Sequence, residues 1–433
     1  MMISLSILMG MFIFSLVPFL LQLFFIPLTF FNIFLIIFII AILLTLGKNR
    51  WKEIPGLWSI KRIKIRLYEW PALGLISFIL LVSLWRSFYL PPTPRDLTSG
   101  PEVIAEYTVK EKTMINSVFT VDLSTTNNQF KSPYITSLQV IYKYAGFKFG
   151  QVWLGILVIC FFVFLYHSLS LHIHRFITGI LLIFFLAIPE MYAYTFMALF
   201  DYPNAVYFFL SCWFLFEFFR NGEKNNILLS GLLMGIATWI RSETLVFGCL
   251  LSFSIMWYHI KRWDSFTSLA RSCLRFLLPS FIFYLIPVVV YLKLYLPGSY
   301  EVSQLINDNL LNPLPLLERF VEMNFALIFS SQGILYYGYF IFIFLLLLVL
   351  DLVFNEKMNR NARNWLYAIL VIYLGYPLLG FVLPLLDIEH STKRGFFKLF
   401  PLMLLYLANS NLLKYISGSL DQWEEKKEVI LNP

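Results

Sequence analysis

ISLSILMGMFIFSLVPFLLQLF at residues 3–24 and LTFFNIFLIIFIIAILLTLG at residues 28–47 decide the fold class of this chain. Neither stretch contains a charged residue, and each has the roughly 20 residues that a helix needs to cross a bilayer. Similar apolar stretches recur throughout the sequence. We therefore predict an all-α, polytopic transmembrane helical bundle of about twelve helices, at residues 3–24, 28–47, 70–90, 152–171, 176–195, 204–220, 227–240, 243–259, 276–296, 336–354, 365–385 and 396–413.

The composition agrees with this fold class. Of the 433 residues, 59% are hydrophobic and only 13% are charged, whereas ordinary globular chains have about 45–50% apolar and about 25% charged residues. Residues 1–24 lack the basic start and the small-residue cleavage site of a signal peptide, so we expect a retained helix.

Lysine and arginine residues cluster in the segments between apolar stretches. The richest segment, residues 48–69, is predicted to be cytoplasmic by the positive-inside rule. Alternation from there places the later basic turns near residues 220–224, 261–275 and 357–363 on the same side, with both termini inside. Membrane topology thus accounts for the net charge of +8, and we predict no nucleic-acid binding.

These assignments divide the chain into four parts. They are an N-terminal transmembrane hairpin (1–47), a basic cytoplasmic linker (48–69), a transmembrane core (70–413) and a cytoplasmic tail (414–433). Two long connections of the core, at 91–151 and 297–335, are predicted to be extracytoplasmic and to contain short helices.

Acidic residues are scarce, and three of them lie early in the first extracytoplasmic loop: Asp96, Glu102 and Glu106. The spacing of four puts Glu102 and Glu106 on one face of a helix. Such a pair could deprotonate a hydroxyl nucleophile or hold a cation. The alternative is an ordinary solvated helix face beside Lys110 and Lys112.

Asp201 lies in a short turn between two apolar stretches. A carboxylate at such a depth is costly unless it is solvated or partnered, which makes it a functional candidate. The alternative is an ordinary loop aspartate before a helix that Pro203 initiates.

The stretch GLLMGIATWIRSETLVFG at residues 231–248 combines close helix packing with charge. Gly231 and Gly235 form a small-xxx-small face that lets two helices approach closely. Arg241 and Glu243 then interrupt the apolar sequence, either to pair with each other at a helix junction or to place Arg241 against an anionic group.

Three cations, Lys393, Arg394 and Lys398, are predicted on the extracytoplasmic side, against the usual charge bias. Cations at a helix start also oppose the helix dipole. A lipid phosphate or pyrophosphate would offset both effects, since arginine holds phosphate oxygens with a planar fork; ordinary anionic head groups are the alternative. We predict no metal site, because the four cysteines lack CxxC spacing and the His172–His174 pair is isolated.

Taken in order, five stretches resemble the GT-C superfamily of polytopic glycosyltransferases, which includes protein mannosyltransferases and aminoarabinose transferases. The resemblance covers residues 70–413, and the stretches are SGPEVIAEY (99–107), SPYITSLQVIYKYAG (132–146), FDYPNAVYFF (200–209), SGLLMGIATWIRSE (230–243) and KRGFFKLFPLMLLYLA (393–408). In that superfamily the catalytic acid lies near the start of the first outer loop. The Asp-Glu dipeptide of the family is absent here, so the resemblance leaves Asp96, Glu102 and Glu106 open as the catalytic acid.

The resemblance implies a transferase in the cell (inner) membrane with an extracytoplasmic active site. A sugar would pass, with inversion, from a polyprenyl-phosphate donor to a hydroxyl of a lipid, glycan or protein acceptor. Lys393, Arg394 and Arg241 would neutralise the donor phosphate, and Glu243 completes the candidate substrate-binding residues. Asp201 would orient the acceptor or hold a divalent cation, the one cofactor that the resemblance leaves open.

Two other classes of membrane protein remain as alternatives. A lipid-linked glycan ligase or polymerase would rely on Arg and His in a large late loop, whereas residues 297–335 contain only Arg319 and no His. A lipid or solute transporter would be expected to show inverted repeats, and the two halves of the sequence do not match. A polytopic protein without enzymatic activity is the third alternative.

Overall fold

The computed structural model describes residues 1–46, 65–91, 98–121, 132–148, 151–295, 314–354, 357–383 and 386–431. Within these ranges the regular elements are all helices. Asp96 and nearly all of the predicted linker 48–69 lie outside the described residues. The expected helical architecture is therefore present wherever the structure describes the chain.

Six of the described helices are long and apolar enough to cross a membrane, and the number rises to eight if each of two bent helix pairs counts as one span. They differ from the predicted spans chiefly at breaks in the chain. The predicted span 176–195 becomes Arg175–Leu186 and Pro189–Ala193, because Pro189 has no N–H to continue the first helix and instead starts the second. Its 12-residue first part covers only about 18 Å.

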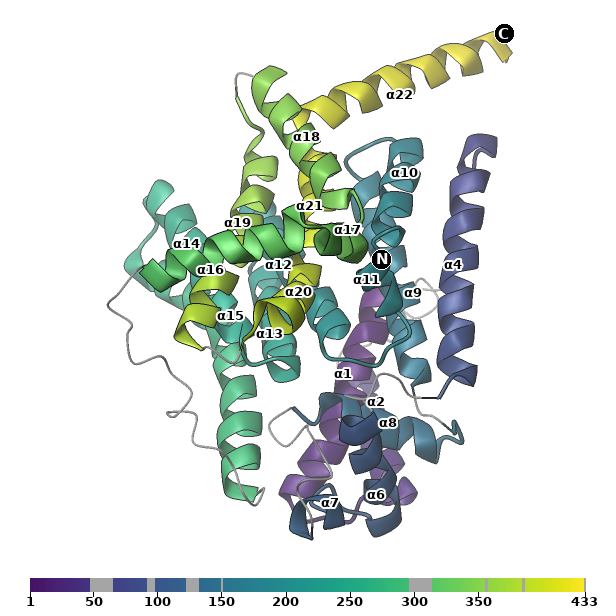
Figure 1. Ribbon diagram of the computed structural model, residues 1–433, viewed down its shortest axis with the longest axis vertical. Helices are drawn as coiled ribbons and strands as arrows, with labels where there is room; N and C mark the ends of the chain where they lie inside the picture. The colour runs from purple at the N-terminus through teal and green to yellow at the C-terminus, as the bar shows by residue number, and fades with distance from the viewer. Residues whose placement is uncertain are drawn as a thin grey trace. The chain divides into compact units, whose positions relative to one another are not determined.

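The contacts divide the chain into two compact units, of which the first comprises residues 1–164, 195–200 and 286–299. Its helices (Figure 1) are α1 (Met2–Leu23), α2 (Phe30–Leu46), α4 (Trp70–Tyr89), α6 (Val103–Glu111), α7 (Ser117–Thr120), α8 (Tyr134–Tyr144) and most of α9 (Val152–Ser170), with a helical turn at Thr98–Glu102 before α6.

The N-terminal hairpin of this unit packs against the helices of the first loop. α1 contacts α2 and α8, and α8 contacts α6. Val17, Leu21 and Ile33 of the hairpin share a buried apolar cluster with Val140 and Ile141 of α8.

Polar contacts add to this attachment of the loop to the hairpin. The buried Gln22 side chain accepts hydrogen bonds from Thr113 Oγ1 (2.9 Å) and from the Met114 backbone N–H (2.7 Å). Tyr144 donates to the Leu28 carbonyl at 2.6 Å. The hairpin, which lies outside the family resemblance, thus supports the loop that contains Glu102 and Glu106.

The second unit comprises residues 165–194, 201–285 and 300–433. Its helices are α10 (Arg175–Leu186), α11 (Pro189–Ala193), α12 (Asp201–Asn221), α13 (Lys224–Ile240), α14 (Thr244–Lys261), α15 (Phe266–Tyr284), α16 (Leu314–Asn324), α17 (Ser331–Tyr337), α18 (Phe340–Phe354), α19 (Arg360–Val382), α20 (Lys393–Gly395), α21 (Leu399–Asn409) and α22 (Asn411–Leu431). Figure 1 shows α16 running across α19, which it contacts.

Helix α12 lies at the centre of this unit. Every residue from Asp201 to Phe216 is buried, and α13 packs between α12 and α15. Because α12 is covered on all sides over this length, its first residue, Asp201, is held in the interior of the unit. This central helix positions the charged residues described below.

The two glycines of α13 face α15, as the small-xxx-small pattern predicts. A Cβ on Gly231 would overlap the Arg275 carbonyl oxygen and lie 2.8 Å from that of Phe276. A Cβ on Gly235 would lie 2.7 Å from Phe283 Cδ2 and 3.0 Å from the Pro279 carbonyl carbon. The backbone of α15 therefore approaches α13 as closely as only glycine permits.

We expect Gly231→Ala to destabilise the protein by about 1–3 kcal/mol, because the new methyl group meets backbone atoms that cannot rotate away. The measurement is thermal unfolding of the detergent-solubilised protein. Gly74→Ala is the matched control, since nothing lies within 4 Å of a Cβ at that position in α4 and alanine favours a helix. Equal melting temperatures for the two variants would contradict the close packing of α13 on α15.

Candidate functional site: a buried charge cluster

Three helix ends meet at one point in the second unit. α12 begins at Asp201, α13 ends before Arg241, and Glu243 precedes the first residue of α14. Asn204 fastens these ends together by donating to the Ala237 carbonyl at 2.7 Å and to Thr244 Oγ1 at 2.9 Å. These hydrogen bonds hold the backbone of the three helix ends, and so fix the positions from which the charged side chains extend.

Arg241 lies between the two carboxylates of the junction. Its Nη1 atom contacts Oδ1 of Asp201, and its Nε atom lies 3.0 Å from Oε1 of Glu243. Each charge also suits its helix end, because carboxylates are favoured at helix N-termini and cations at C-termini. The structure thus shows the first of the two sequence interpretations, in which Arg241 pairs with Glu243 at the helix junction, and adds a contact with Asp201.

The segment before α21 adds basic side chains to the junction. Arg394 Nη1 lies 3.7 Å from Oδ2 of Asp201. Lys398 Nζ lies 3.7 Å from Oε1 of Glu243 and 2.7 Å from the hydroxyl of Tyr376. These contacts join residues about 200 positions apart in the sequence into one group.

Lys393 extends the group toward α11. Its ammonium lies 2.8 Å from Oε1 of Glu190 and 4.0 Å from the ring centroid of Tyr336. The Lys393 carbonyl accepts a hydrogen bond from the Tyr337 hydroxyl at 2.7 Å. A Cβ on Gly395 would overlap the Tyr376 ring, so this segment passes directly over α19.

We call these seven residues the charge cluster: Glu190, Asp201, Arg241, Glu243, Lys393, Arg394 and Lys398. Their side chains are at most one-fifth exposed, with Asp201 at 4% and Lys398 at 2%. Four are basic and three acidic, so the seven together have one excess positive charge when all are ionised. Burying ions is costly unless they are paired, and each of the seven has an oppositely charged partner within the cluster.

The first-loop carboxylates form a separate network within the first unit. Glu102 lies 2.6 Å from Lys143 Nζ and accepts a hydrogen bond from Gln139 at 2.7 Å, and Gln139 in turn accepts one from the indole N–H of Trp153. Glu106 lies 3.3 Å from the same lysine ammonium. The pair shares one helix face as predicted, and Lys143 bridges it.

The two carboxylates differ in environment. Burial raises the pKa of Glu102 above its usual value, against the opposing effects of Lys143 and Gln139. Glu106 is 48% exposed; the slight burial acts to raise its pKa, but Lys143 and Lys110 outweigh this and lower it. Of the two, Glu102 is the better proton acceptor at a given pH once it is ionised.

The structure brings all five predicted substrate-binding residues into the charge cluster: Asp201, Arg241, Glu243, Lys393 and Arg394. Glu102 and Glu106 lie together in the first unit, and Asp96 lies outside the described residues. The prediction assigned no role to four residues that contact the candidates: Glu190, Tyr376, Lys143 and Gln139.

The carboxylates of the cluster are paired with its cations. Across the described ranges, no three His, Cys, Asp or Glu side chains are placed to hold a metal ion together. Both carboxylate oxygens of Asp201 contact guanidinium groups. Asp201 therefore serves here to position Arg241 and Arg394 rather than to offer free oxygen ligands.

A serine, a histidine and an aspartate also form a hydrogen-bonded series near the turn between α14 and α15. His259 Nδ1 lies 2.8 Å from Asp264 Oδ2, and its Nε2 lies 2.9 Å from Ser272 Oγ. His259 and Ser272 are both buried, and Ser272 lies inside a regular helix. The series joins the two helices across their turn.

Comparisons with protein-family models, with curated proteins and with solved structures found no match to this chain. Residue roles are therefore inferred from the geometry above and from the order of the sequence motifs.

Proposed function

We propose that this protein is a membrane glycosyltransferase of the GT-C kind. It moves a sugar from a polyprenyl-phosphate donor to a hydroxyl acceptor by inverting displacement. The observation that supports this most strongly is the meeting of three separate motifs, FDYP, IRSE and KRGFFK, in one buried charge cluster. The order of the motifs in the sequence resembles that of the family. The contacts among their side chains support a shared role for the three motifs in binding the substrate.

The membrane topology belongs to the same proposal. We propose about twelve crossings, counting bent and short helices, in the cell (inner) membrane, with the charge cluster on the extracytoplasmic side. In support, α12, α14 and α19 each have their basic turns at one end and their contacts with the cluster at the other. The positive-inside rule then assigns the basic ends to the cytoplasm.

The donor phosphate is held by the cations of the cluster. Lys393 and Arg394 lie between the helical turn Ile388–Thr392 and α21, and both side chains reach the charge cluster. Arg241 is the third candidate contact, oriented by Asp201 and Glu243. As the bond between the anomeric carbon and the phosphate oxygen breaks, the same cations stabilise the charge on the departing polyprenyl phosphate.

The acceptor requires a general base, and Glu102 is our choice among the first-loop acids. Its burial and raised pKa suit proton abstraction better than the half-exposed position of Glu106. Glu102 takes the proton of the acceptor hydroxyl, whose oxygen bonds to the anomeric carbon. Lys143 and Gln139 hold the carboxylate in one orientation.

Donor recognition can be tested by native mass spectrometry of the detergent-solubilised protein with a long-chain polyprenyl phosphate. We expect the phosphate to bind and the matching polyprenol to bind at least about 10-fold more weakly, because only the phosphate compensates the buried cations. The Lys393→Gln, Arg394→Gln double variant should lose this preference.

Lys224→Gln is the matched control, because Lys224 is exposed at the opposite end of α13 from Arg241. It should bind the phosphate as the wild type does. Equal binding of phosphate and alcohol by the wild type, or an unchanged preference in the double variant, would contradict the donor site. Transfer of labelled sugar from lipid-linked sugars of the source membranes then tests the reaction itself.

A further inference from the structure

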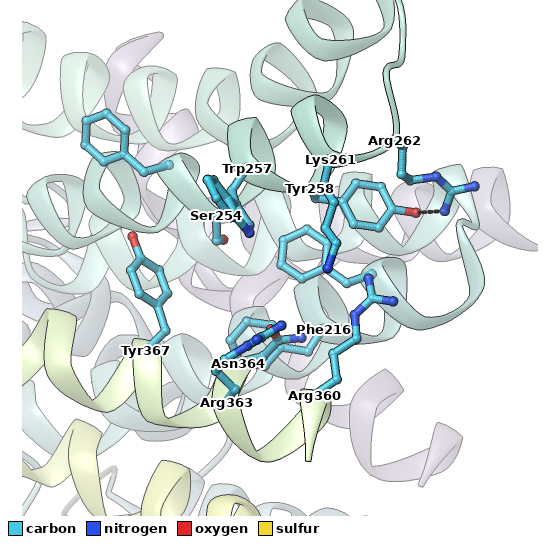
Figure 2. A pocket seen from close by; sticks show the side chains of 12 residues that line it. Phe216, Ser254, Trp257, Tyr258, Lys261, Arg262, Arg360, Arg363, Asn364 and Tyr367 are labelled. Carbon is cyan, nitrogen blue, oxygen red and sulfur yellow. Dashed lines mark hydrogen bonds between the residues drawn. The ribbon is translucent and has the colours of Figure 1, made fainter. Parts of the chain in front are cut away.

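A pocket lies at the other end of the helices that reach the charge cluster. Its volume is about 560 Å³, and its walls come from the C-terminal halves of α12 and α14 and the N-terminal part of α19. This size lies within the usual range for small-molecule sites. The residues that line it are shown in Figure 2.

Basic side chains dominate the polar part of this pocket. Lys261 and Arg262 come from the end of α14, and Arg360 and Arg363 from the start of α19. None of the twelve lining residues is acidic. In Figure 2, Lys261, Arg262 and Arg360 extend to the same end of the pocket, where Arg262 donates a hydrogen bond to the Tyr258 hydroxyl.

This concentration of positive charge goes beyond what topology requires. The positive-inside rule predicts basic residues near the helix ends, but it does not predict that four of them line one cavity. Arg360 and Arg363 also lie in the first turn of α19, which contains no acidic residue and where cations oppose the helix dipole. An anion bound among them would relieve both the mutual repulsion and the unfavourable position.

The rest of the pocket is aromatic and open to the surroundings. Trp257 is 68% exposed and Phe253 is 57% exposed, although both line the cavity. Figure 2 places Trp257 and Tyr367 away from the end where the cations gather. Exposed tryptophan next to basic residues is typical of the level of lipid head groups.

The pocket and the charge cluster are separated by about the thickness of a membrane. α12 has 21 residues and α14 has 18, which correspond to about 30 and 27 Å. Asp201 and Glu243 lie at the first ends of these helices, and Phe219 and Lys261 at the last. The two sites therefore lie at opposite ends of α12 and α14, and α14 is one of the helices long and apolar enough to cross a membrane.

We propose that this pocket binds one anionic phospholipid of the leaflet opposite the charge cluster. The phosphate contacts Lys261, Arg360 and Arg363, and an acyl chain follows the exposed aromatic surface of Phe253 and Trp257. Basic pockets between transmembrane helices are suited to such head groups. The combination of a cationic end and an open apolar side favours a lipid over a free anion.

The test is native mass spectrometry of the detergent-solubilised full chain titrated with phosphatidylglycerol. We expect one phosphatidylglycerol to bind in preference to phosphatidylcholine. The Arg360→Gln, Arg363→Gln double variant should bind it about 30-fold more weakly, given the usual contribution of each basic residue at an anionic lipid surface. Circular dichroism and thermal unfolding establish that the double variant is folded.

Arg271→Gln is the matched control, since Arg271 is exposed on α15 and does not line the pocket. It should leave phosphatidylglycerol binding unchanged. Equal binding of the two lipids, an equal loss in the Arg271 variant, or full competition by inorganic phosphate would overturn the proposal, the last by identifying a free-anion site. The Arg360 and Arg363 substitutions leave polyprenyl phosphate binding unchanged, so this test is independent of the proposed transferase function.

Discussion

Arg241→Gln should lower the free energy of unfolding by about 3–5 kcal/mol, the usual cost of removing one partner from a buried ion pair. The variant leaves Asp201 and Glu243 without their shared guanidinium in a region that is at most one-fifth exposed. Arg394 and Lys398 lie farther from these carboxylates, at 3.7 Å, and compensate only in part. Thermal and chemical unfolding in detergent measure the effect.

A double-mutant cycle with Asp201→Asn distinguishes the loss of an ion pair from the loss of side-chain packing. If the charges interact as the distances indicate, the Arg241→Gln, Asp201→Asn protein will be more stable than the sum of the two single changes predicts. Strict additivity would contradict the pairing. The contact between Arg241 and Asp201 would then contribute nothing to stability.

Glu102→Gln should reduce sugar transfer by about 100-fold or more while leaving the fold intact, because the amide cannot accept the acceptor proton. The pH dependence of the transfer rate provides a second test of Glu102 as the base. Only ionised Glu102 is a base, so the wild-type rate should fall as the pH decreases through the pKa of this group. Since burial raises that pKa, the fall should begin at a higher pH than for an ordinary glutamate. Transfer rates measured across pH give both results.

Glu106→Gln is the matched control for this experiment. Glu106 lies one turn along the same helix and contacts the same lysine, but it is half-exposed and its pKa is lowered. The Glu106→Gln variant should retain most of the transfer activity, and its rate should fall at low pH as the wild-type rate does. If Glu102→Gln stayed fully active, or if Glu106→Gln alone abolished transfer, the assignment of the base to Glu102 would be wrong.

Much of the charge cluster was predictable because charge is rare in this sequence. Asp201, Arg241 and Arg394 stand out as ionisable residues beside long apolar stretches, where only partnered or functional groups are tolerated. Each was a candidate by itself, and the family resemblance grouped them. The structure adds that they contact one another through a junction of three helix ends.

The residues that were missed needed three-dimensional information. Tyr376 is one of 24 tyrosines, and nothing in its local sequence marks it as a partner of Lys398. Gln139 is neutral and Lys143 is basic, and both belong to an ordinary helix. Their contacts with Glu102 span 37 and 41 positions of the sequence. Long-range pairing of this kind leaves no periodic signal in the sequence.

Helix ends were predictable only where the chain provides a clear stop. The predicted span 227–240 agrees with α13, because Arg241 ends the apolar stretch, whereas 396–413 is divided at Ser410 into α21 and α22. Hydropathy identifies apolar segments but not the bends within them, so counts of spans from sequence and from structure differ. The basic pocket illustrates the same gap, since topology predicts its arginines but not their convergence.

The attachment of the first loop to α1 and α2 also bears on the order in which the protein is made. A ribosome delivers the N-terminus first, and domains generally fold in that direction. The apolar surface that includes Val17, Leu21 and Ile33 is therefore already made when α6 and α8 are synthesised. The loop with Glu102 can fold onto this template at once, without waiting for synthesis of the rest of the chain.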